Sequence, residues 1–355
     1  MNLVLYTTKN QDEITGKIPE NYLRFLMKNP FSYDGAPIML RVEEKDICIG
    51  SVYAFPIQLC YKNSETFTAC AGSTLFVNPQ SRGKGIAKSL TLKRLDLSKD
   101  KIAIASGLSS MSLPLFKKLE FNIFMSQRNI FLKNSRPVVE IFLKNSFFLT
   151  LFSSIANIFL KLQRSILNWQ RKRIFTGFKV EETTTVPQEV ADIVANDTAL
   201  FRENHTKEWF EWVLKGGFTD DARSTQHLFV VKQANEIIGF YMTKERFHEQ
   251  ASHRGFRNVI LGSVIEWGVK QSVSIKDEYL VLDAILSFGK HVHAVEVCSA
   301  YANINRFLKK RFLISIGKSN FAIRAQDDSP FAKYSEYKNQ CNWRIRPAAS
   351  DNSFN

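Results

Sequence analysis

Apolar residues along the first 132 positions change their spacing several times, which predicts alternating strands and helices. Runs with the two-residue period of strands fall at 2–7, 38–42, 47–55, 67–77, 102–106 and 123–132. Apolar residues at helical spacing fall at 19–28, 85–97 and 113–119. Strands and helices in this order predict an α/β (α+β) domain built on a mixed sheet.

The same pattern returns in a weaker form in the second half of the chain. Residues 21–31 resemble 208–218, each a helical run of aromatic and aliphatic residues that ends at a pair of helix breakers. A hairpin follows each run, with Gly50 and Gly239 in matching places, and residues 116–121 resemble 307–312. Three matches in the same order predict two tandem domains. We place the boundaries of domains, linker and C-terminal tail at 1–134, 135–175, 176–330 and 331–355.

The linker has an unusual distribution of polar residues. They recur every three or four positions, at Ser146, Thr150, Ser153, Asn157, Lys161, Arg164 and Asn168. This spacing predicts one long amphipathic helix over 138–168, with a wide apolar face and a narrow polar stripe. So large an apolar face is rarely left exposed, and three placements stay open: burial between the domains, a dimer interface, or contact with a membrane surface.

Charge is concentrated in the same region. The chain has a formal net charge of +14, and ten Lys and Arg lie between Arg128 and Lys179 with Glu140 as the single acid. The remainder is mildly basic, which argues against a general nucleic-acid binder. Five cysteines without metal-site or disulfide spacing, and a start unlike a signal peptide, predict a cytoplasmic protein without a metal, with the inner membrane surface as a further possibility.

The segment 75–90 carries the clearest chemistry. A predicted strand leads into a loop in which Gly83 and Gly85 flank Lys84, and a helix follows at once. Glycines allow a sharp turn and a close approach to a ligand, and the first N–H groups of a helix form an anion site. Arg82 and Lys84 add positive charge, so the loop suits a pyrophosphate. Neither a dinucleotide fingerprint nor a P-loop pattern is present.

These residues resemble the GNAT acetyltransferase family, whose coenzyme A loop reads Arg/Gln-x-x-Gly-x-Gly/Ala after a strand. Arg82, Gly85 and Ala87 fit this pattern. The family's later signature of strand, polar residue and Lys-x-x-Phe helix end matches, in order, residues 102–106, 109–112 and 116–121. The resemblance covers 1–132 well and 176–325 weakly.

The resemblance implies a binding site for acetyl-coenzyme A as the acyl donor. The strand backbone would pair with the pantetheine arm, and the loop would bind the pyrophosphate. The coenzyme-binding residues implied in this way are Leu75, Phe76, Val77, Arg82, Gly83, Lys84, Gly85, Ile86, Ala87, Ser110 and Phe116.

The chain departs from the family where acid–base chemistry is expected. Phe116 stands where many members have a Tyr that protonates the leaving thiolate, and Glu120 stands where Gly is usual. The strand 68–77 has no acid to serve as a general base, and the hydroxyl of Ser73 is a poor one. The catalytic residues therefore stay unassigned.

The second half lacks the loop, since residues 266–274 contain no Gly-x-Gly/Ala, and we expect it to close over an acceptor instead. Together with Asn-Pro-Phe at 29–31, this layout resembles bacterial tandem acyltransferases. It implies transfer of an acetyl group to an amine of a bulky acceptor, with an amino sugar of cell-surface polysaccharide as a candidate. Two alternatives stay open: Fem-type aminoacyl transfer from aminoacyl-tRNA, and a non-catalytic scaffold that binds coenzyme A.

Overall fold

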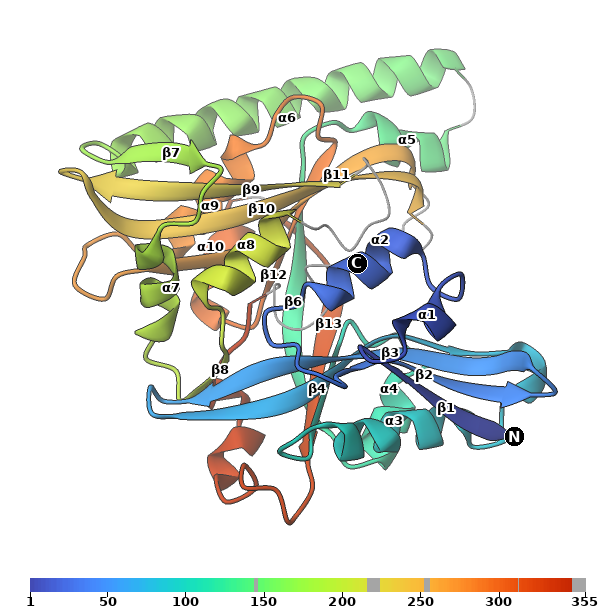
Figure 1. Ribbon diagram of the computed structural model, residues 1–355. Coiled ribbons are helices and arrows are strands. Elements are labelled where there is room, and N and C mark those ends of the chain that lie inside the picture. The colour runs from blue at the N-terminus through green and yellow to red at the C-terminus, as the bar shows by residue number, and fades with distance from the viewer. Residues whose placement is uncertain (144–145, 216–223, 252–255, 312, 347–355) are drawn as a thin grey trace. The chain divides into compact units, whose positions relative to one another are not determined.

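The computed structural model describes residues 1–143, 146–215, 224–251, 256–311 and 313–346, and Phe312 of the second matching segment lies outside them. Its helices and strands follow an order that occurs twice (Figure 1). The first round comprises β1 (Asn2–Thr7), α1 (Gln11–Ile14), α2 (Glu20–Met27), β2 (Pro37–Glu44), β3 (Ile47–Tyr61), β4 (Glu65–Val77), the short 3₁₀ turn η1 (Pro79–Ser81), α3 (Ile86–Leu97), β5 (Ile102–Ser106), α4 (Leu113–Lys118) and β6 (Asn122–Leu132).

The second round has the same succession with one added short strand, β8. It comprises β7 (Lys179–Thr183), α7 (Gln188–Ala195), β8 (Phe201–Glu203), α8 (Lys207–Lys215), β9 (Ser224–Gln233), β10 (Glu236–Ala251), β11 (Phe256–Val269), α9 (Asp277–Ser287), β12 (Ala294–Ser299), α10 (Ala302–Lys309) and β13 (Ile314–Ala325). The mixed α/β class and the predicted order of elements are confirmed.

The chain divides into two compact units, and neither is contiguous in sequence. Unit 1 is made of Met1–Met125, Ala195–Asp220 and Ser319–Asn355, and unit 2 of Ser126–Val194 and Asp221–Lys318. This differs from the contiguous division at 134 and 176 that the sequence suggests. The last strand of each round is exchanged between the units. Most of β6, from the first round, belongs to unit 2, and the second half of β13, from the second round, belongs to unit 1.

The exchanged strands extend the strand order within each unit. In unit 1 the order β1-β2-β3-β4-β5 continues into β13, whose segment 321–325 lies antiparallel to β5. In unit 2 the order β7-β9-β10-β11-β12 continues into β6, which lies antiparallel to β12. Each unit contains one parallel pair of corresponding strands, β4 with β5 in unit 1 and β11 with β12 in unit 2.

A glycine in each hairpin sets how closely the next helix packs on its sheet. A Cβ at Gly50 would lie 2.5 Å from Cγ2 of Ile86 in α3, and one at Gly239 would lie 3.2 Å from Cδ1 of Leu280 in α9. Any larger residue would push the helix away from the strand. Gly50 and Gly239 therefore have the same role in the two units, which is to allow the helix to pack closely on the strand.

The end of the chain packs into unit 1. Residues 331–346, which the sequence analysis assigns to a C-terminal tail, form η2 (Ser335–Lys338), η3 (Gln340–Asn342) and β14 (Trp343–Arg344). Phe331 and Trp343 are buried, and the ring of Trp343 stacks on that of Phe201 at 5.2 Å between centroids. β14 pairs in parallel with β8, which itself pairs with β3.

The linker forms two helices, so the prediction of one helix over 138–168 was wrong. α5 (Arg136–Phe142) ends where Leu143 turns extended, and α6 runs from Ser146 to Ile174. Ser135 joins the two helices: its hydroxyl donates to the Ser153 carbonyl at 3.0 Å, and its backbone N–H donates to Oδ1 of Asn157 at 2.9 Å. Asn157 of the predicted stripe is thus bound by Ser135, the N-cap residue of α5.

Ser153, Asn157 and Arg164 of the polar stripe face the rest of unit 2, whereas Thr150 and Lys161 of the stripe and the wide apolar face are exposed. Nη2 of Arg164 lies 3.4 Å from the Lys133 carbonyl, and Arg171 forms an ion pair with the buried Asp283 of α9. Arg164 and Arg171 thus find their partners within unit 2, on the side of α6 away from its wide apolar face. Among the described residues no helix is long and apolar enough to cross a bilayer.

Candidate coenzyme A site

Strand β4 has a bulge near its end. Phe76 lies opposite Ser51 and Ser73 opposite Tyr53, so two residues of β4 face one residue of β3. Thr74, one of these two, has a φ of +53°, which a β-branched residue adopts only under constraint. A bulge bends its strand and redirects the backbone groups around it. The segment that follows is therefore aimed differently from the rest of β4.

The pairing between the two parallel strands of unit 1, β4 and β5, ends just before the bulge. Pairing between β4 and β5 covers only Cys70–Gly72 against Ala103–Ala105, whereas β4 continues to Val77. The predicted pantetheine-binding segment 75–77 lies on this continuation. Its edge toward β5 carries backbone groups that an extended ligand can pair with as an added strand.

The predicted loop follows directly and holds two left-handed residues. Gly83 and Gly85 have φ values of +83° and +80°, and a Cβ at either would meet no atom within 4 Å. Gly85 is the N-cap of α3, and its carbonyl accepts the first bond of the helix, from the Ser89 N–H at 3.0 Å. Backbone conformation, not crowding, therefore requires glycine at these two positions.

The loop presents donors and positive charge without internal partners. In the described part of the chain, the backbone N–H groups of residues 83–87 donate no hydrogen bond, and Arg82 and Lys84 make no ion pair. Residues 82–85 are all exposed, and α3 has no acid in its first turn. Free N–H groups at the positive end of a helix, beside two cations, form an anion site.

The other predicted contacts lie on the neighbouring elements. Ile86 and Ala87 form the first turn of α3, and Ile86 is buried against β3. Ser110 is exposed in the loop between β5 and α4. Phe116, on α4, is buried in a core cluster, where its ring meets that of Phe121 edge-on with 4.8 Å between centroids. The structure thus gathers the loop and the β4 edge, whereas Phe116 has a packing role; its contact with coenzyme stays a prediction.

Side chains with hydroxyl groups lie on β4 where a general base would be expected. Ser73 is buried, its Oγ lies 3.2 Å from Oγ1 of Thr74, and Tyr53 stands opposite it on β3. The Tyr53 ring lies 4.5 Å from that of Tyr22 on α2. Burial raises the pKa of Tyr53, so this phenol keeps its proton and suits a donor better than a base. Sequence reasoning missed Tyr53, although the hairpin register could have placed it beside Ser73.

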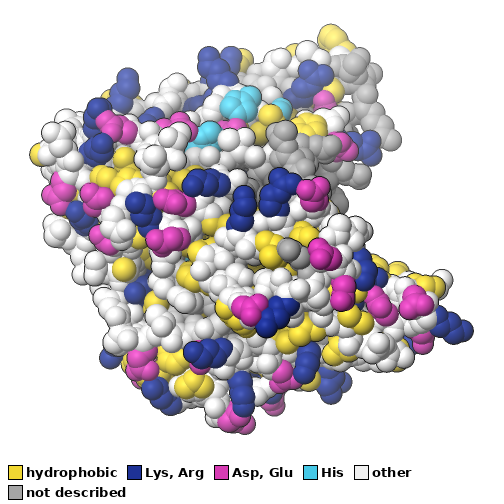
Figure 2. All heavy atoms as spheres, in the orientation of Figure 1, with side chains coloured by type: hydrophobic (Ala, Val, Ile, Leu, Met, Phe, Trp, Pro, Cys, Tyr) yellow, Lys and Arg dark blue, Asp and Glu magenta, His cyan; other side chains and the backbone are white. Residues whose placement is uncertain are grey.

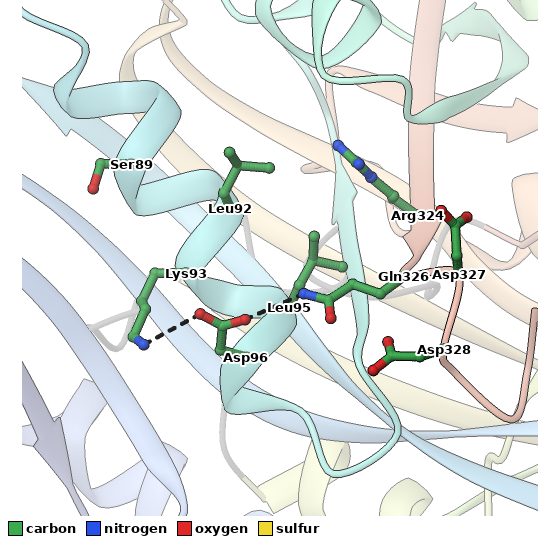
Figure 3. Close-up of a pocket in the computed structure, with 9 residues that line it drawn as sticks. All are labelled: Ser89, Leu92, Lys93, Leu95, Asp96, Arg324, Gln326, Asp327 and Asp328. Atoms are coloured by element: carbon green, nitrogen blue, oxygen red, sulfur yellow. Dashed lines mark hydrogen bonds and ion pairs between the residues drawn. The ribbon is translucent and has the colours of Figure 1, made fainter.

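A separate open pocket of about 640 Å³ lies along the C-terminal half of α3 (Figure 3). Asp96 accepts hydrogen bonds there from Lys93 and Gln326, and Asp327 and Asp328 line the opposite wall. Three carboxylates make this pocket unsuitable for a pyrophosphate. We therefore locate the anion site at the loop, at the other end of the helix.

Solved structures resemble this arrangement over most of the chain. N-myristoyltransferase from Saccharomyces cerevisiae with bound myristoyl-CoA aligns with a TM-score of 0.57 and 14% identity, covering 91% of this chain and 79% of that one. A GCN5-related N-acetyltransferase from Anabaena variabilis aligns with a TM-score of 0.54 and 9% identity, covering 91% and 72%. The chain has the GNAT fold. A probable N-acyltransferase from Enterococcus faecalis aligns with a TM-score of 0.53 and 9% identity, covering 91% and 72%.

No protein-family model and no curated protein matches the sequence. The GNAT likeness therefore establishes the fold, and the chemistry must be argued from the residues of unit 1. The part of β4 beyond its pairing with β5 and the glycine loop before α3 are the features of unit 1 that bear on function.

Proposed function

We propose that the protein is an acyl-coenzyme A-dependent N-acyltransferase, which moves an acetyl group from acetyl-coenzyme A to an amine of a bulky acceptor. The observation that carries this proposal is the succession, within unit 1, of the β4 bulge, the unpaired strand edge and the left-handed glycine loop at the start of α3. A thioester with a pantetheine arm and a pyrophosphate matches these features in the same order.

The residues at the β4 bulge suggest how the reaction is assisted. The attacking amine must lose a proton, and the thiolate of coenzyme A must gain one. Residues 66–77 of β4 contain no carboxylate, whereas hydroxyls of Ser73, Thr74 and Tyr53 are grouped there. Tyr53, with its raised pKa, can donate to the leaving thiolate, and a water held by Ser73 can carry the amine proton.

A second candidate function differs in the length of the acyl chain. One observation favours a longer chain as a second candidate: a protein of the same fold holds myristoyl-CoA in its solved structure. An amino sugar of cell-surface polysaccharide remains our suggestion for the acceptor on the basis of the resemblance alone. Aminoacyl-tRNA as donor is disfavoured because the coenzyme loop is intact.

Calorimetry and turnover test the proposal in two steps. Acetyl-, octanoyl- and myristoyl-coenzyme A are titrated into the protein, and release of free thiol is then followed with a panel of peptide and amino-sugar amines. We expect micromolar binding of at least one thioester, and turnover with it. Binding without turnover on any amine would identify a coenzyme A-binding scaffold, and no binding of any thioester would overturn the proposal.

A further inference from the structure

The outward face of α6 is a continuous apolar surface. Eight large side chains on it are exposed to solvent: Leu151, Phe152, Ile155, Ile158, Phe159, Leu162, Ile166 and Trp169. Ile158, Phe159 and Leu162 at its centre are 63%, 67% and 59% exposed. Their spacing of three and four residues puts them on one side of the helix, over about 27 Å of its length. We call this surface the α6 stripe.

The opposite side of α6 is fixed to unit 2, so the stripe cannot turn inward. Ser153 is buried, and Leu167 belongs to the core cluster of unit 2. The buried carboxylate of Asp283 on α9 pairs with Arg171 and accepts a hydrogen bond from the Tyr241 hydroxyl at 2.6 Å. Turning the stripe inward would leave this carboxylate without its cation, which is costly.

The charge beside the stripe is of one sign. α6 has five cations and no acid. Arg164 and Arg171 point to unit 2, whereas Lys161, Lys172 and Arg173 are exposed, and the guanidinium of Arg173 lies 4.9 Å from the centre of the Trp169 ring. On the face shown in Figure 2, by contrast, basic and acidic side chains are interspersed.

We propose that the α6 stripe docks on an anionic lipid surface, with its apolar side chains among the acyl chains and Lys161, Lys172 and Arg173 at the phosphate headgroups. An apolar face flanked only by cations, with a Trp at one end, is the composition that binds in the interface plane. A second copy of the chain fits less well. Antiparallel α6 helices centred on the stripe would bring Lys161 next to its own counterpart, with no acid on α6 to compensate.

Vesicle flotation of the full chain tests this docking, with phosphatidylcholine alone and with about one third phosphatidylglycerol. We expect binding to the anionic vesicles that weakens with salt. Ile158→Gln, Phe159→Gln and Leu162→Gln combined should reduce it roughly a hundredfold. Lys161→Gln, Lys172→Gln and Arg173→Gln combined should reduce it by about fivefold for each charge. Leu3→Gln with Ile47→Gln, two exposed apolar residues of unit 1, is the matched control and should bind like the parent protein.

Two further measurements make the outcome decisive and are independent of the coenzyme site. Lipids brominated in their acyl chains should quench the fluorescence of Trp169. The protein should therefore lose fluorescence on binding these lipids, and the Trp169→Phe variant should not show this loss. Sedimentation without lipid should give a monomer. Failure to bind anionic vesicles, undiminished binding of the Ile158, Phe159 and Leu162 variant, or a dimer that this variant dissociates would overturn the proposal, the last in favour of a second copy.

Discussion

Helices α3 and α9 occupy the same place in the two units but serve different purposes. Each follows a bulged strand, since β11 also carries an extra residue against β10, between Met242 and Thr243. The α3 helix begins at an exposed glycine loop with no acid in its first turn, whereas α9 begins with Asp277 and Glu278. Carboxylates at the positive end of a helix occupy the place an anion would take.

The difference shows that the strand geometry alone does not make an anion site. Both units have the bulge and the parallel strand pair, yet among the described residues two left-handed glycines lie directly before α3 and none lies directly before α9. In unit 2, residues 280–285 of α9 are fully buried, and α6 packs over this helix. The second helix has become a packing surface, and its one buried acid, Asp283, holds α6 in place.

The largest effect, on the free energy of unfolding, is expected at Asp283 on α9, the helix that α6 covers. Asp283→Ala removes the acceptor shared by Arg171 and Tyr241 and should lower the free energy of unfolding by about 3–5 kcal/mol, because a paired cation is left partly buried. Asp96→Ala on α3 is the control, since Asp96 is half-exposed and pairs with Lys93 on the surface, and should cost less than about 1 kcal/mol. Urea denaturation measures both, and equal costs would contradict the comparison.

The next prediction compares coenzyme A binding after substitutions at the N-termini of α3 and α9. Gly85→Asp puts a carboxylate where the pyrophosphate should bind and should weaken coenzyme A binding roughly a hundredfold. Asp tolerates the left-handed backbone better than most residues, and no atom lies within 4 Å of the added Cβ, so the fold should persist. Lys276→Asp at the N-cap of α9 should leave the affinity unchanged. Calorimetry that finds Gly85→Asp as tight as the parent would place the anion elsewhere.

A smaller effect should follow from the charge beside the loop. Arg82→Ala should weaken coenzyme A binding about tenfold, since one hydrogen bond to a charged group is lost while the backbone donors remain. Lys93→Ala removes a cation from the far end of the same helix and should change the affinity less than about twofold. Similar losses in the two variants would mean that the loop acts only through overall charge.

The smallest effect is a pH dependence confined to unit 2. Burial, with Arg164 nearby, lowers the pKa of Lys133 from 10.5 to about 8, and Lys133 donates to the carbonyls of Phe288 and Gly289. Because the folded state then binds this proton less tightly than the unfolded state, stability should rise from pH 8 toward 10.5. Lys133→Met should lose this increment, which thermal unfolding of both proteins across that range would show; parallel curves would refute the assignment.

Local features were predictable from the sequence, and features that depend on distant partners were not. The loop 82–87 was found because its glycines, cations and helix start are adjacent in the chain. The strand exchange was missed because β6 and β13 are apolar strands that suit either sheet. The spacing of Ser153, Asn157 and Arg164 identified a polar face on the linker helix but not its direction, which is set by Ser135 and the Lys133 carbonyl.

The exchange of final strands also constrains how the chain can be made and folded. β5 of unit 1 needs residues 321–325 beside it, and β8 needs β14 from residues 343–344. During synthesis from the N-terminus, the coenzyme loop therefore leaves the ribosome more than two hundred residues before its own sheet can be completed. Contacts so distant in sequence slow folding. Early truncations in unit 2 should consequently impair the coenzyme site, although none of its residues would be removed.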